Sequence, residues 1–290
     1  PPLQIFLFQK NEQEVAVCWK RGIPLEYTFS KKICRVLDRD GLEIKTSNNK
    51  IIINESPQYV FLNQDKGESL PLERRTLPLH SVGFKEDEVE DYERRRYRGL
   101  DQRIVDWRER RILKNLLKRI NRHSTRVLDI PSGYGRFSSL LLEHCFILTS
   151  CDLSFYMVKR ALTKKRPSGR QWGVVADAKK GLPFKKGSFT LLLSIRFFHH
   201  LHSHQEREFI LREFACLSSR WLIISYYKRT IFHLIQRKFR RKLKRSRTRI
   251  KMLPGHELKE EIAQTGWRLL REYSLCKGLH AQHIALLEKI

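Results

Sequence analysis

Three aspartates that each follow an apolar run are the residues best placed to bind a ligand. Asp129 comes directly before a short loop that contains two glycines, Gly133 and Gly135. Asp152 lies about twenty residues further along the chain, and Asp177 stands in the segment ADA. Glycine lets the backbone come close to a ligand and adopts positive φ at little cost. The loop and the three acids together therefore indicate a binding site.

The chemistry that each acid can perform narrows the choice of ligand. A carboxylate before the loop, Asp129, disfavours a pyrophosphate and suits a cationic ligand. Asp152 can accept both hydroxyls of a ribose, and Asp177 can accept the exocyclic amine of an adenine. A dinucleotide fingerprint would need a third glycine where Ser138 stands, and the loop lacks the G-K-[ST] ending of a P-loop. A sulfonium-bearing amino acid, a ribose and an adenine are the parts of S-adenosylmethionine.

Each aspartate also has an ordinary structural explanation. Asp129 could cap a helix or serve as a loop acid, and Asp177 could be a turn residue. Asp152 could N-cap the next helix, because the segment DLSF fits that pattern. The ligand-binding hypothesis therefore depends on all three acids occurring in this order and with this spacing.

The elements that must position these acids alternate between strands and helices. Apolar runs predict strands at RVLDI, FILTSCDL, QWGVVADA, FTLLLSI and RWLIISYY, and then at RLLREYSL and HIALLEK. Helical patterns fall at 101–120, 137–144, 154–165, 204–217 and 255–265. This alternation predicts an α/β fold: a Rossmann-like, mainly parallel sheet with helices on both faces and a C-terminal antiparallel hairpin. In such sheets ligands bind beyond the carboxyl ends of the strands, where the three acids are expected.

The first part of the chain has a different pattern. Residues 1–62 contain β-branched or aromatic runs separated by turn signals, which predicts a small all-β module of about five strands, part of a sandwich. Residues 63–100 have two Leu-Pro pairs and little periodicity, so we expect a linker there. Residues 101–290 are then the α/β domain. The chain opens without Met in an apparent strand, which fits a fragment or a processed product.

The motifs of the α/β domain resemble those of a known family. Residues from about 100 to 290 look like a class I S-adenosylmethionine-dependent methyltransferase of the type-11, ubiquinone-biosynthesis-like group, through VLDIPSGYG, CDLSFYMVKRA and VVADAKKGLPFKKGSFTLLLS. The resemblance implies a methyltransferase activity with S-adenosylmethionine as cofactor. Pro131 and Ser132 replace a common Gly-Cys pair, Thr190 stands where the group often has Asp, and the usual Gly pair before the fifth strand is missing. Residues 1–62 show a weaker resemblance to the terminal β-sandwich of some clan-A glycoside hydrolases, which implies no catalysis here.

The cofactor is expected to contact the acids, the glycines and their neighbours at the strand ends. This set comprises Asp129, Gly133, Gly135, Asp152, Leu153, Asp177, Ala178 and Ser194. Because methyl transfer is an in-line displacement at a sulfonium carbon, the enzyme mainly has to align the donor with the acceptor and exclude water.

Two histidines after the fourth strand are the candidate general bases. The segment SIRFFHHLHSH places His199 and His200 near the expected position of the methyl group. An imidazole has a pKa that suits the deprotonation of a hydroxyl. The alternative is that these histidines cap the next helix or pack against Phe197 and Phe198. His200 and His204 have a spacing that could suit a metal, but nothing supplies further ligands, so no metal is expected.

The net charge of +27 favours an anionic partner. Ten of the fifteen residues in 237–251 are Lys or Arg, and with TIFHLIQ before it this tract reads as a basic amphipathic helix. It suits an anionic membrane surface or a phosphorylated lipid or glycan. RNA is the alternative partner. The tract could also be a solvated charged helix that binds no partner. No apolar run is long enough to span a bilayer.

These features lead to one preferred function and two alternatives. We expect an O- or C-methyltransferase acting on a small-molecule, lipid or glycan acceptor. An RNA methyltransferase is the alternative within the same fold, and a non-catalytic binding protein on a methyltransferase scaffold is the alternative outside catalysis. The six cysteines show no C-x-x-C pair or zinc-ligand spacing, which favours a reducing, cytoplasmic location. The basic tract 237–251 adds the expectation that the protein is peripheral on the inner face of the membrane.

Overall fold

The structure, a computed structural model, divides into two compact units. The first comprises Pro1–Leu79 with Leu182–Lys186, and the second His80–Gly181 with Gly187–Ile290. The residues that the structure describes are 4–10, 13–19, 24–29, 32–39, 42–46, 48–54, 58–62, 86–96, 99–120, 125–144, 147–163, 170–228, 252, 254–276 and 281–290. The basic tract 237–251 lies outside them.

The first unit is a small antiparallel β-module. Its larger sheet has the order β1-β2-β6-β4, with β1 at Gln4–Lys10, β2 at Gln13–Trp19, β6 at Gln58–Leu62 and β4 at Ile33–Leu37. A second sheet pairs β3, Leu25–Thr28, with β5, Lys50–Ile53. Alternate residues of β5, Ile51 and Ile53, are buried in the module's core, as expected for a strand with one solvent-facing side. The prediction of five strands missed β4, whose short run contains the exposed Cys34 and Arg35.

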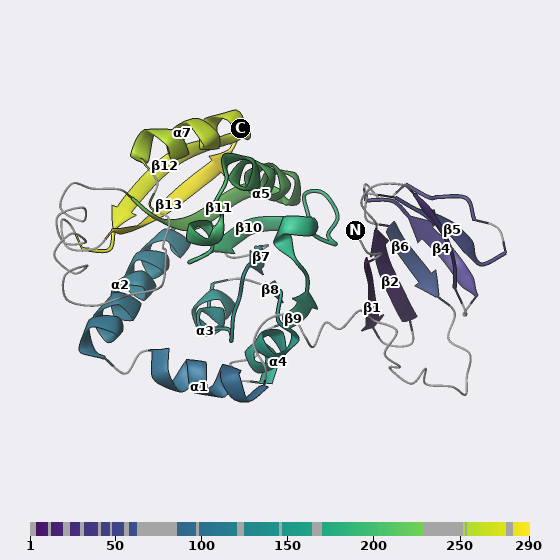
Figure 1. The fold of residues 1–290 in the computed structure, drawn as a ribbon, viewed down its shortest axis with the longest axis horizontal. Helices are drawn as coiled ribbons and strands as arrows, with labels where there is room; N and C mark the ends of the chain where they lie inside the picture. Colours follow the sequence, from purple (N-terminus) through teal and green to yellow (C-terminus); the bar gives the residue numbers. More distant parts are fainter. Residues whose placement is uncertain are drawn as a thin grey trace. The chain divides into compact units, whose positions relative to one another are not determined.

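The second unit contains a seven-stranded sheet of the order β12-β13-β11-β10-β7-β8-β9 (Figure 1). Its strands are β7 Arg126–Asp129, β8 Ile147–Asp152, β9 Arg170–Val175, β10 Phe189–Ser194, β11 Ser218–Tyr227, β12 Trp267–Ser274 and β13 Gln282–Lys289. The strands from β9 to β11 pair in parallel, and β13 pairs antiparallel with both β11 and β12. The predicted Rossmann-like sheet with a C-terminal hairpin is confirmed.

The central strands are buried on both faces, which explains why they read as continuous apolar runs. Leu191, Leu192 and Leu193 of β10 have no exposed surface, and Val127 and Leu128 opposite them in β7 have almost none. The chain runs from β7 outward to β8 and β9, and then returns to β10 on the other side of β7. The strand order therefore reverses between β7 and β10, which is where open α/β sheets bind ligands.

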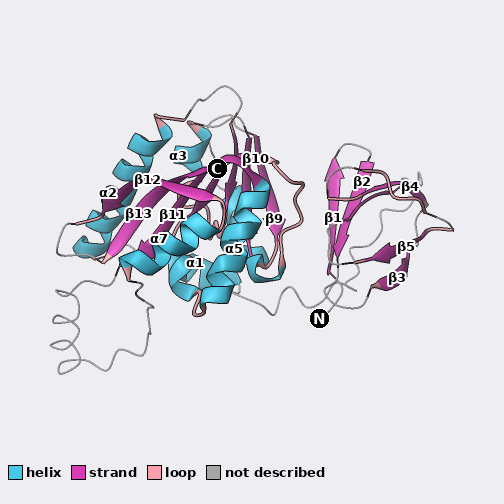
Figure 2. Cartoon of the chain, turned by 90° about the horizontal axis from the view of Figure 1, so that it is seen from above, coloured by secondary structure: helices cyan, strands magenta, loops and turns pink. Residues whose placement is uncertain are grey.

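Helices cover both faces of this sheet (Figure 2). They are α1 Glu86–Arg96, α2 Leu100–Leu117, α3 Ser138–Leu142, α4 Phe155–Thr163, α5 His204–Leu217 and α7 Gly255–Gln264, with short 3-10 turns η2 Ala178–Lys180 and η3 Phe198–His200. Leu113 and Leu116 of α2 pack with Leu141 of α3 against the sheet residues Leu191 and Ile223. In Figure 2, α5 and α7 lie on the opposite side. Among the described helices none is long and apolar enough to cross a membrane.

The segment expected to be a linker, 63–100, contains helix α1. Its acidic first half and basic second half form i,i+4 pairs, such as Arg95 with Asp91 at 2.9 Å, and such pairs stabilise a helix. Arg160 of α4 donates to Glu93 at 2.9 Å. Helix α1 thus belongs to the second unit, which begins at His80 rather than at residue 101.

Candidate functional site

The loop after β7 lies across the end of β8. The backbone N–H of Ser132 donates to the carbonyl of Cys151 at 2.8 Å, and that of Gly133 donates to Oδ2 of Asp152 at 2.9 Å. Gly133 and Gly135 have φ values of 53° and 74°, in the left-handed region that glycine enters without the steric cost that a Cβ brings. The two glycines are therefore needed for the shape of the loop.

Asp152 both caps a helix and faces the loop. Its Oδ1 accepts from the N–H of Ser154 at 2.9 Å at the start of α4, while Oδ2 accepts from Gly133. The two explanations from the sequence, a helix cap and a ligand-binding acid, are therefore compatible. Burial raises the pKa of Asp152, and the N–H groups of Ser154 and Gly133 act in the opposite direction. A half-buried carboxylate held by two backbone donors is a fixed hydrogen-bond acceptor.

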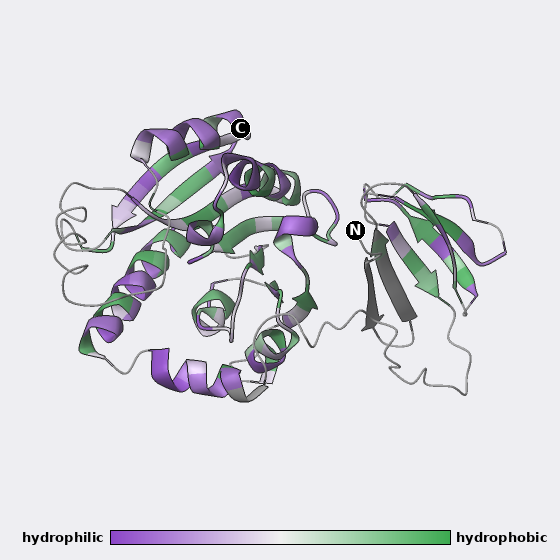
Figure 3. Ribbon diagram, viewed as in Figure 1, coloured by the Kyte–Doolittle hydropathy of each residue, from purple (hydrophilic) through white to green (hydrophobic). Residues whose placement is uncertain are grey.

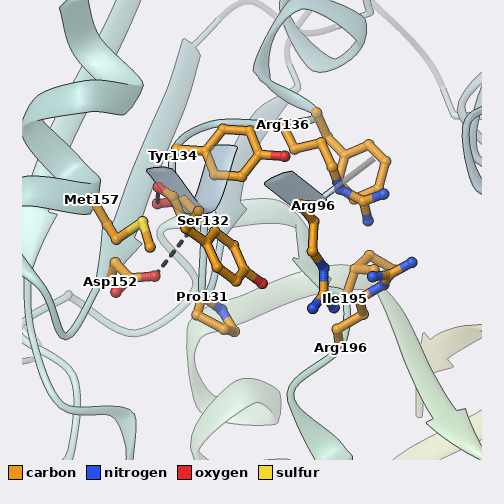
Figure 4. Close-up of a pocket in the computed structure, with 12 residues that line it drawn as sticks. Arg96, Pro131, Ser132, Tyr134, Arg136, Asp152, Met157, Ile195 and Arg196 are labelled. Carbon is orange, nitrogen blue, oxygen red and sulfur yellow. Dashed lines mark hydrogen bonds between the residues drawn. The ribbon is translucent and has the colours of Figure 1, made fainter. Parts of the chain in front are cut away.

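A pocket of about 190 Å³ opens between the loop, α1 and the end of β10 (Figure 4). It is lined by Tyr92, Arg96, Pro131, Ser132, Gly133, Tyr134, Arg136, Phe137, Asp152, Met157, Ile195 and Arg196. Asp152 and Met157 lie at one end, and Arg96 and Arg196 lie together at the other. Val89 of α1 packs with Tyr134 and Met157, so apolar contacts place α1 as one wall.

A buried carboxylate beneath the pocket joins two of its arginines. Glu109 of α2 has no exposed surface and accepts from Arg136, from Arg196 at 3.0 Å and from Gln282 of β13 at 2.6 Å. Burial would raise the pKa of Glu109, but the charges and hydrogen bonds of the two arginines outweigh it and hold that pKa below its usual value. The carboxylate is therefore ionised and fixes both guanidinium groups in place.

The two arginines at the far end of the pocket differ in their partners. Arg196 has a φ of 60°, which is unusual for a residue with a side chain, and its N–H donates to Oγ of Ser225 at 2.6 Å. Half-buried Arg96 lies over the ring of Tyr92 at 5.3 Å. Arg96 forms no ion pair with any residue that the structure describes. The pocket therefore presents a positive charge that the described carboxylates leave available.

Of the predicted residues at the ends of β7, β8 and β10, two line this pocket. Gly133 and Asp152 line it. Asp129 is almost fully buried at the end of β7, and Gly135 follows in the loop. Ser194 is fully buried directly before the lining residues Ile195 and Arg196, and its Oγ has no hydrogen-bond partner among the described residues. These strand ends meet as the fold predicts.

The predicted residues next to them do not line the pocket. Asp177 caps the turn η2, accepting from the N–H of Lys179 at 3.0 Å, and lies 3.6 Å from Nζ of Lys180. Ala178 is buried within that turn, and Leu153 is largely exposed. In this structure Asp177 acts as the turn residue that the sequence offered as the alternative.

The two candidate catalytic histidines lie in the turn η3, outside the pocket wall. His199 is half-buried with its ring 5.2 Å from Tyr227, and its Nδ1 finds no hydrogen-bond partner among the described residues. Burial, with His200, Arg196 and Arg96 nearby, lowers the pKa of His199 to about 4. More of the His200 side chain is exposed. The part of its ring that is shielded from water, and then the nearby His202 and Lys179, lower the pKa of His200. No cluster of three metal-ligating side chains occurs in the described part of the chain.

Several lining residues were not identified from the sequence. Tyr92 and Arg96 belong to the helix read as a linker, whose alternation of acid and base at i,i+4 spacing was the available signal. Arg136 directly follows Gly135, and Tyr134 lies between the two glycines, so the motif itself contained them. Met157 carried no signal, because its place in the pocket depends on how α4 packs.

Comparison with known proteins gives one family match and many structural matches. The model of the methyltransferase domain family matches residues 128–217, and no curated protein matches the chain. Magnesium protoporphyrin IX methyltransferase from Synechocystis PCC 6803 with bound SAH aligns at a TM-score of 0.59 and 16% identity, over 71% of this chain and 96% of that one. The PH0226 protein from Pyrococcus horikoshii OT3 aligns at 0.54 and 18%, over 72% of this chain and 100% of that one. At these identities the structural matches establish the fold.

The residues present fit S-adenosylmethionine in part of the site. The half-buried Asp152 carboxylate could accept hydrogen bonds from ribose hydroxyls, and the backbone of Gly133 and Gly135 has no side chain in the way. The volume of the pocket is below the roughly 300 Å³ at which small-molecule sites begin, and Asp177 is not among its lining residues. The fit therefore rests on the loop and on Asp152. Residues 128–217 match the methyltransferase domain family, and the strand order agrees with the fold of the solved methyltransferase that aligns with the chain.

Proposed function

We propose that the protein transfers the methyl group to an oxygen or carbon of a small-molecule, lipid or glycan acceptor that carries an anionic group. This proposal rests on the position of Arg96 and on its lack of an ion pair with the described residues. Arg96 is half-buried in the pocket wall beside Arg196 and forms no ion pair with any described residue. Two neighbouring guanidinium groups, of which Glu109 neutralises only one, favour a ligand with a carboxylate or phosphate.

The cofactor would be held by residues of the three strand ends after β7, β8 and β9. We assign the ribose to Asp152 and Leu153, the amino-acid part to the backbone of the Gly133–Gly135 loop with Asp129, and the adenine to Asp177 and Ala178. Ser194 would lie near the methyl group. The bound cofactor supplies an activated methyl on a sulfonium. The chain's own contribution is then to align the acceptor with it and to exclude water.

His199 is the proposed proton acceptor, with the exposed His200 as the alternative. At neutral pH His199 is uncharged, because burial and then nearby His200, Arg196 and Arg96 lower its pKa to about 4. A base of so low a pKa is weak. An anionic acceptor group bound between Arg96 and Arg196 would oppose their charges and raise the pKa of His199. His199 would then be a stronger base when the acceptor is bound than when the pocket is empty.

The basic tract 237–251 is the proposed contact with an anionic membrane or a phosphorylated lipid or glycan. It has ten Lys or Arg among fifteen residues and lies outside the described part of the chain. RNA is the alternative acceptor, since a tract of this charge also suits a phosphate backbone. A non-catalytic scaffold is the alternative to transfer.

The test follows the labelled methyl group of S-adenosylmethionine into two acceptor fractions, a lipid and small-molecule extract and total RNA. We expect saturable cofactor binding that falls about tenfold or more in Asp152→Asn, since the hydroxyl-accepting charge is lost. We expect Arg96→Gln to keep the cofactor affinity and to lose most transfer. Asp91→Asn, which removes the acid of an exposed pair on the same helix α1, is the control and should change neither.

Three outcomes count against this function. Labelled methyl that enters RNA and is released by ribonuclease would show that the acceptor is RNA and not a small molecule, lipid or glycan. Normal methyl transfer by Arg96→Gln would show that the acceptor is not recognised through an anionic group. Cofactor binding that is absent, or unaffected by Asp152→Asn, would favour the non-catalytic scaffold.

A further inference from the structure

The outward face of helix α2 combines large apolar side chains with basic ones. At 100° per residue, seven residues fall within an arc of about 100°, and we call this set the α2 outer face: Leu100, Arg103, Ile104, Trp107, Arg111, Lys114 and Lys118. Its three apolar members are 76%, 56% and 53% exposed. The buried side of the helix, with Glu109 and Leu113, packs on the sheet.

The charge of this face has one sign. The three acids of the helix, Asp101, Asp106 and Glu109, all lie outside the arc, and two of them take part in the network at the pocket. None of the four basic members forms an ion pair with a described residue. The guanidinium of Arg111 lies 5.2 Å from the ring of Trp107. The α2 outer face therefore combines a positive charge, from its four basic side chains, with exposed apolar surface from the other three.

We propose that the α2 outer face docks the protein onto an anionic lipid surface. Lys and Arg stems can lie along the apolar side chains while their charged ends reach lipid phosphates, and tryptophan favours the membrane–water interface. A basic helix with an exposed aliphatic and aromatic strip has the composition of an interfacial helix. RNA would gain from the charges and from stacking on Trp107, but it offers nothing that would bury Leu100 and Ile104.

The helix that carries the α2 outer face also supports the pocket. The inner side of α2 carries Glu109, which holds Arg136 and Arg196 of the pocket, and its first residue follows α1, which ends at the pocket residue Arg96. A lipid surface bound by the outer face would therefore contact the element that positions the acceptor end of the pocket. The proposal does not depend on the basic tract 237–251 or on the identity of the acceptor.

The test measures binding of the full chain to sedimented vesicles at about 0.15 M salt. Vesicles of phosphatidylcholine alone are compared with vesicles that contain about one third phosphatidylglycerol. We expect binding to the anionic vesicles only, and a loss of about tenfold or more in the double variant Ile104→Ser/Trp107→Ser. The control variant Trp172→Ser removes an exposed tryptophan from β9 and should bind as the parent does.

A second measurement checks that Trp107 itself enters the lipid. Tryptophan emission should shift to the blue on anionic vesicles, and this shift should be lost in Trp107→Phe, which keeps an apolar ring in place. Unchanged vesicle binding in the double variant would overturn the proposal and assign binding to other basic residues. A double variant that keeps vesicle binding but loses binding to single-stranded RNA would overturn it in favour of a nucleic-acid surface. Cofactor affinity, measured in parallel, should stay at the parent's value and shows that the variant is folded.

Discussion

Glu109 is the residue on which the two arginine-bearing loops of the pocket converge. It receives hydrogen bonds from the loop after β7, through Arg136, and from the loop after β10, through Arg196. Gln282 donates from the antiparallel strand β13. A buried carboxylate with three donors is favourable only while those donors are present, because burial by itself disfavours the charge.

Glu109→Gln should therefore be strongly destabilising. The amide keeps the size of the side chain but removes the buried counter-charge that Arg136 and Arg196 share, and of these two Arg136 retains another acid, Asp106 at 2.8 Å. Breaking a buried pair of this kind costs about 3 kcal/mol or more. Urea unfolding measures the change. Glu90→Gln, which removes an acid 3.6 Å from Arg94 on the exposed side of α1, should cost less than about 0.5 kcal/mol. Equal losses in the two variants would contradict the role given to Glu109.

His199 makes the stability depend on pH. Its pKa is lowered from 6.5 to about 4 in the folded chain, first by burial, so the unfolded chain takes up the proton at higher pH. The free energy of unfolding should therefore fall as the pH drops from about 6.5 towards 4 and show no further loss from this group below that.

The size of this effect is limited by the partial exposure of the ring. Between pH 7 and pH 5 we expect the parent to lose about 1 kcal/mol more than His199→Gln, measured by urea unfolding at both pH values. The variant serves as the control because all other histidines are retained. A variant with the same pH dependence as the parent would show that His199 does not titrate in this range.

Helices α5 and α7 are joined by a buried ion pair. Helix α5 starts with a capping box, in which Oγ of Ser203 accepts from the N–H of Glu206 at 3.0 Å. Beyond the cap, fully buried Arg207 donates to Glu261 at 2.8 Å and also to Glu257 on α7. Because the sequence between α5 and α7 is long, this contact fixes where α7 lies.

Arg207→Met should cost about 3 kcal/mol of unfolding free energy, because it leaves the buried Glu261 carboxylate with only the exposed His204 as a partner. The double variant Arg207→Met/Glu261→Leu should recover most of that loss, since it removes both charges and keeps the volume. Arg212→Met is the matched control on the same helix: its pair with Glu208, at 2.8 Å, is exposed, so it should cost less than about 1 kcal/mol. A double variant as unstable as the single one would show that the packing of Arg207, and not its charge, holds α7.

At the scale of the whole molecule, each unit has its own core. The β-module buries Val36, Ile53 and Val60, while the larger unit packs α2 and α3 against its sheet. All residues that line the pocket belong to the larger unit. In Figure 3 helices α2 and α5 of the larger unit carry both green and purple, as expected for helices with one buried face. The pocket is therefore built by one unit alone.

Sequence patterns predicted the sheet of the larger unit well and the pocket only in part. Buried parallel strands are apolar on both faces, so β7, β8 and β10 stood out as continuous runs with an acid or a serine at the end. Strand β4 was missed because its short run is broken by exposed residues, and α1 was missed because it is nearly all charged. Such a helix gives no apolar stripe to detect.

By itself the sequence determined the α/β fold class, the glycine loop and the acids at the strand ends, because each depends on neighbours along the chain. Only the tertiary structure decided that Arg96 shares a pocket with Arg196, and that Glu109, 87 residues before Arg196 and 173 before Gln282, joins them. It also placed Asp177 in a turn outside that pocket. Contacts between residues so far apart depend on how helices pack on the sheet, and residue spacing alone carries no record of that packing.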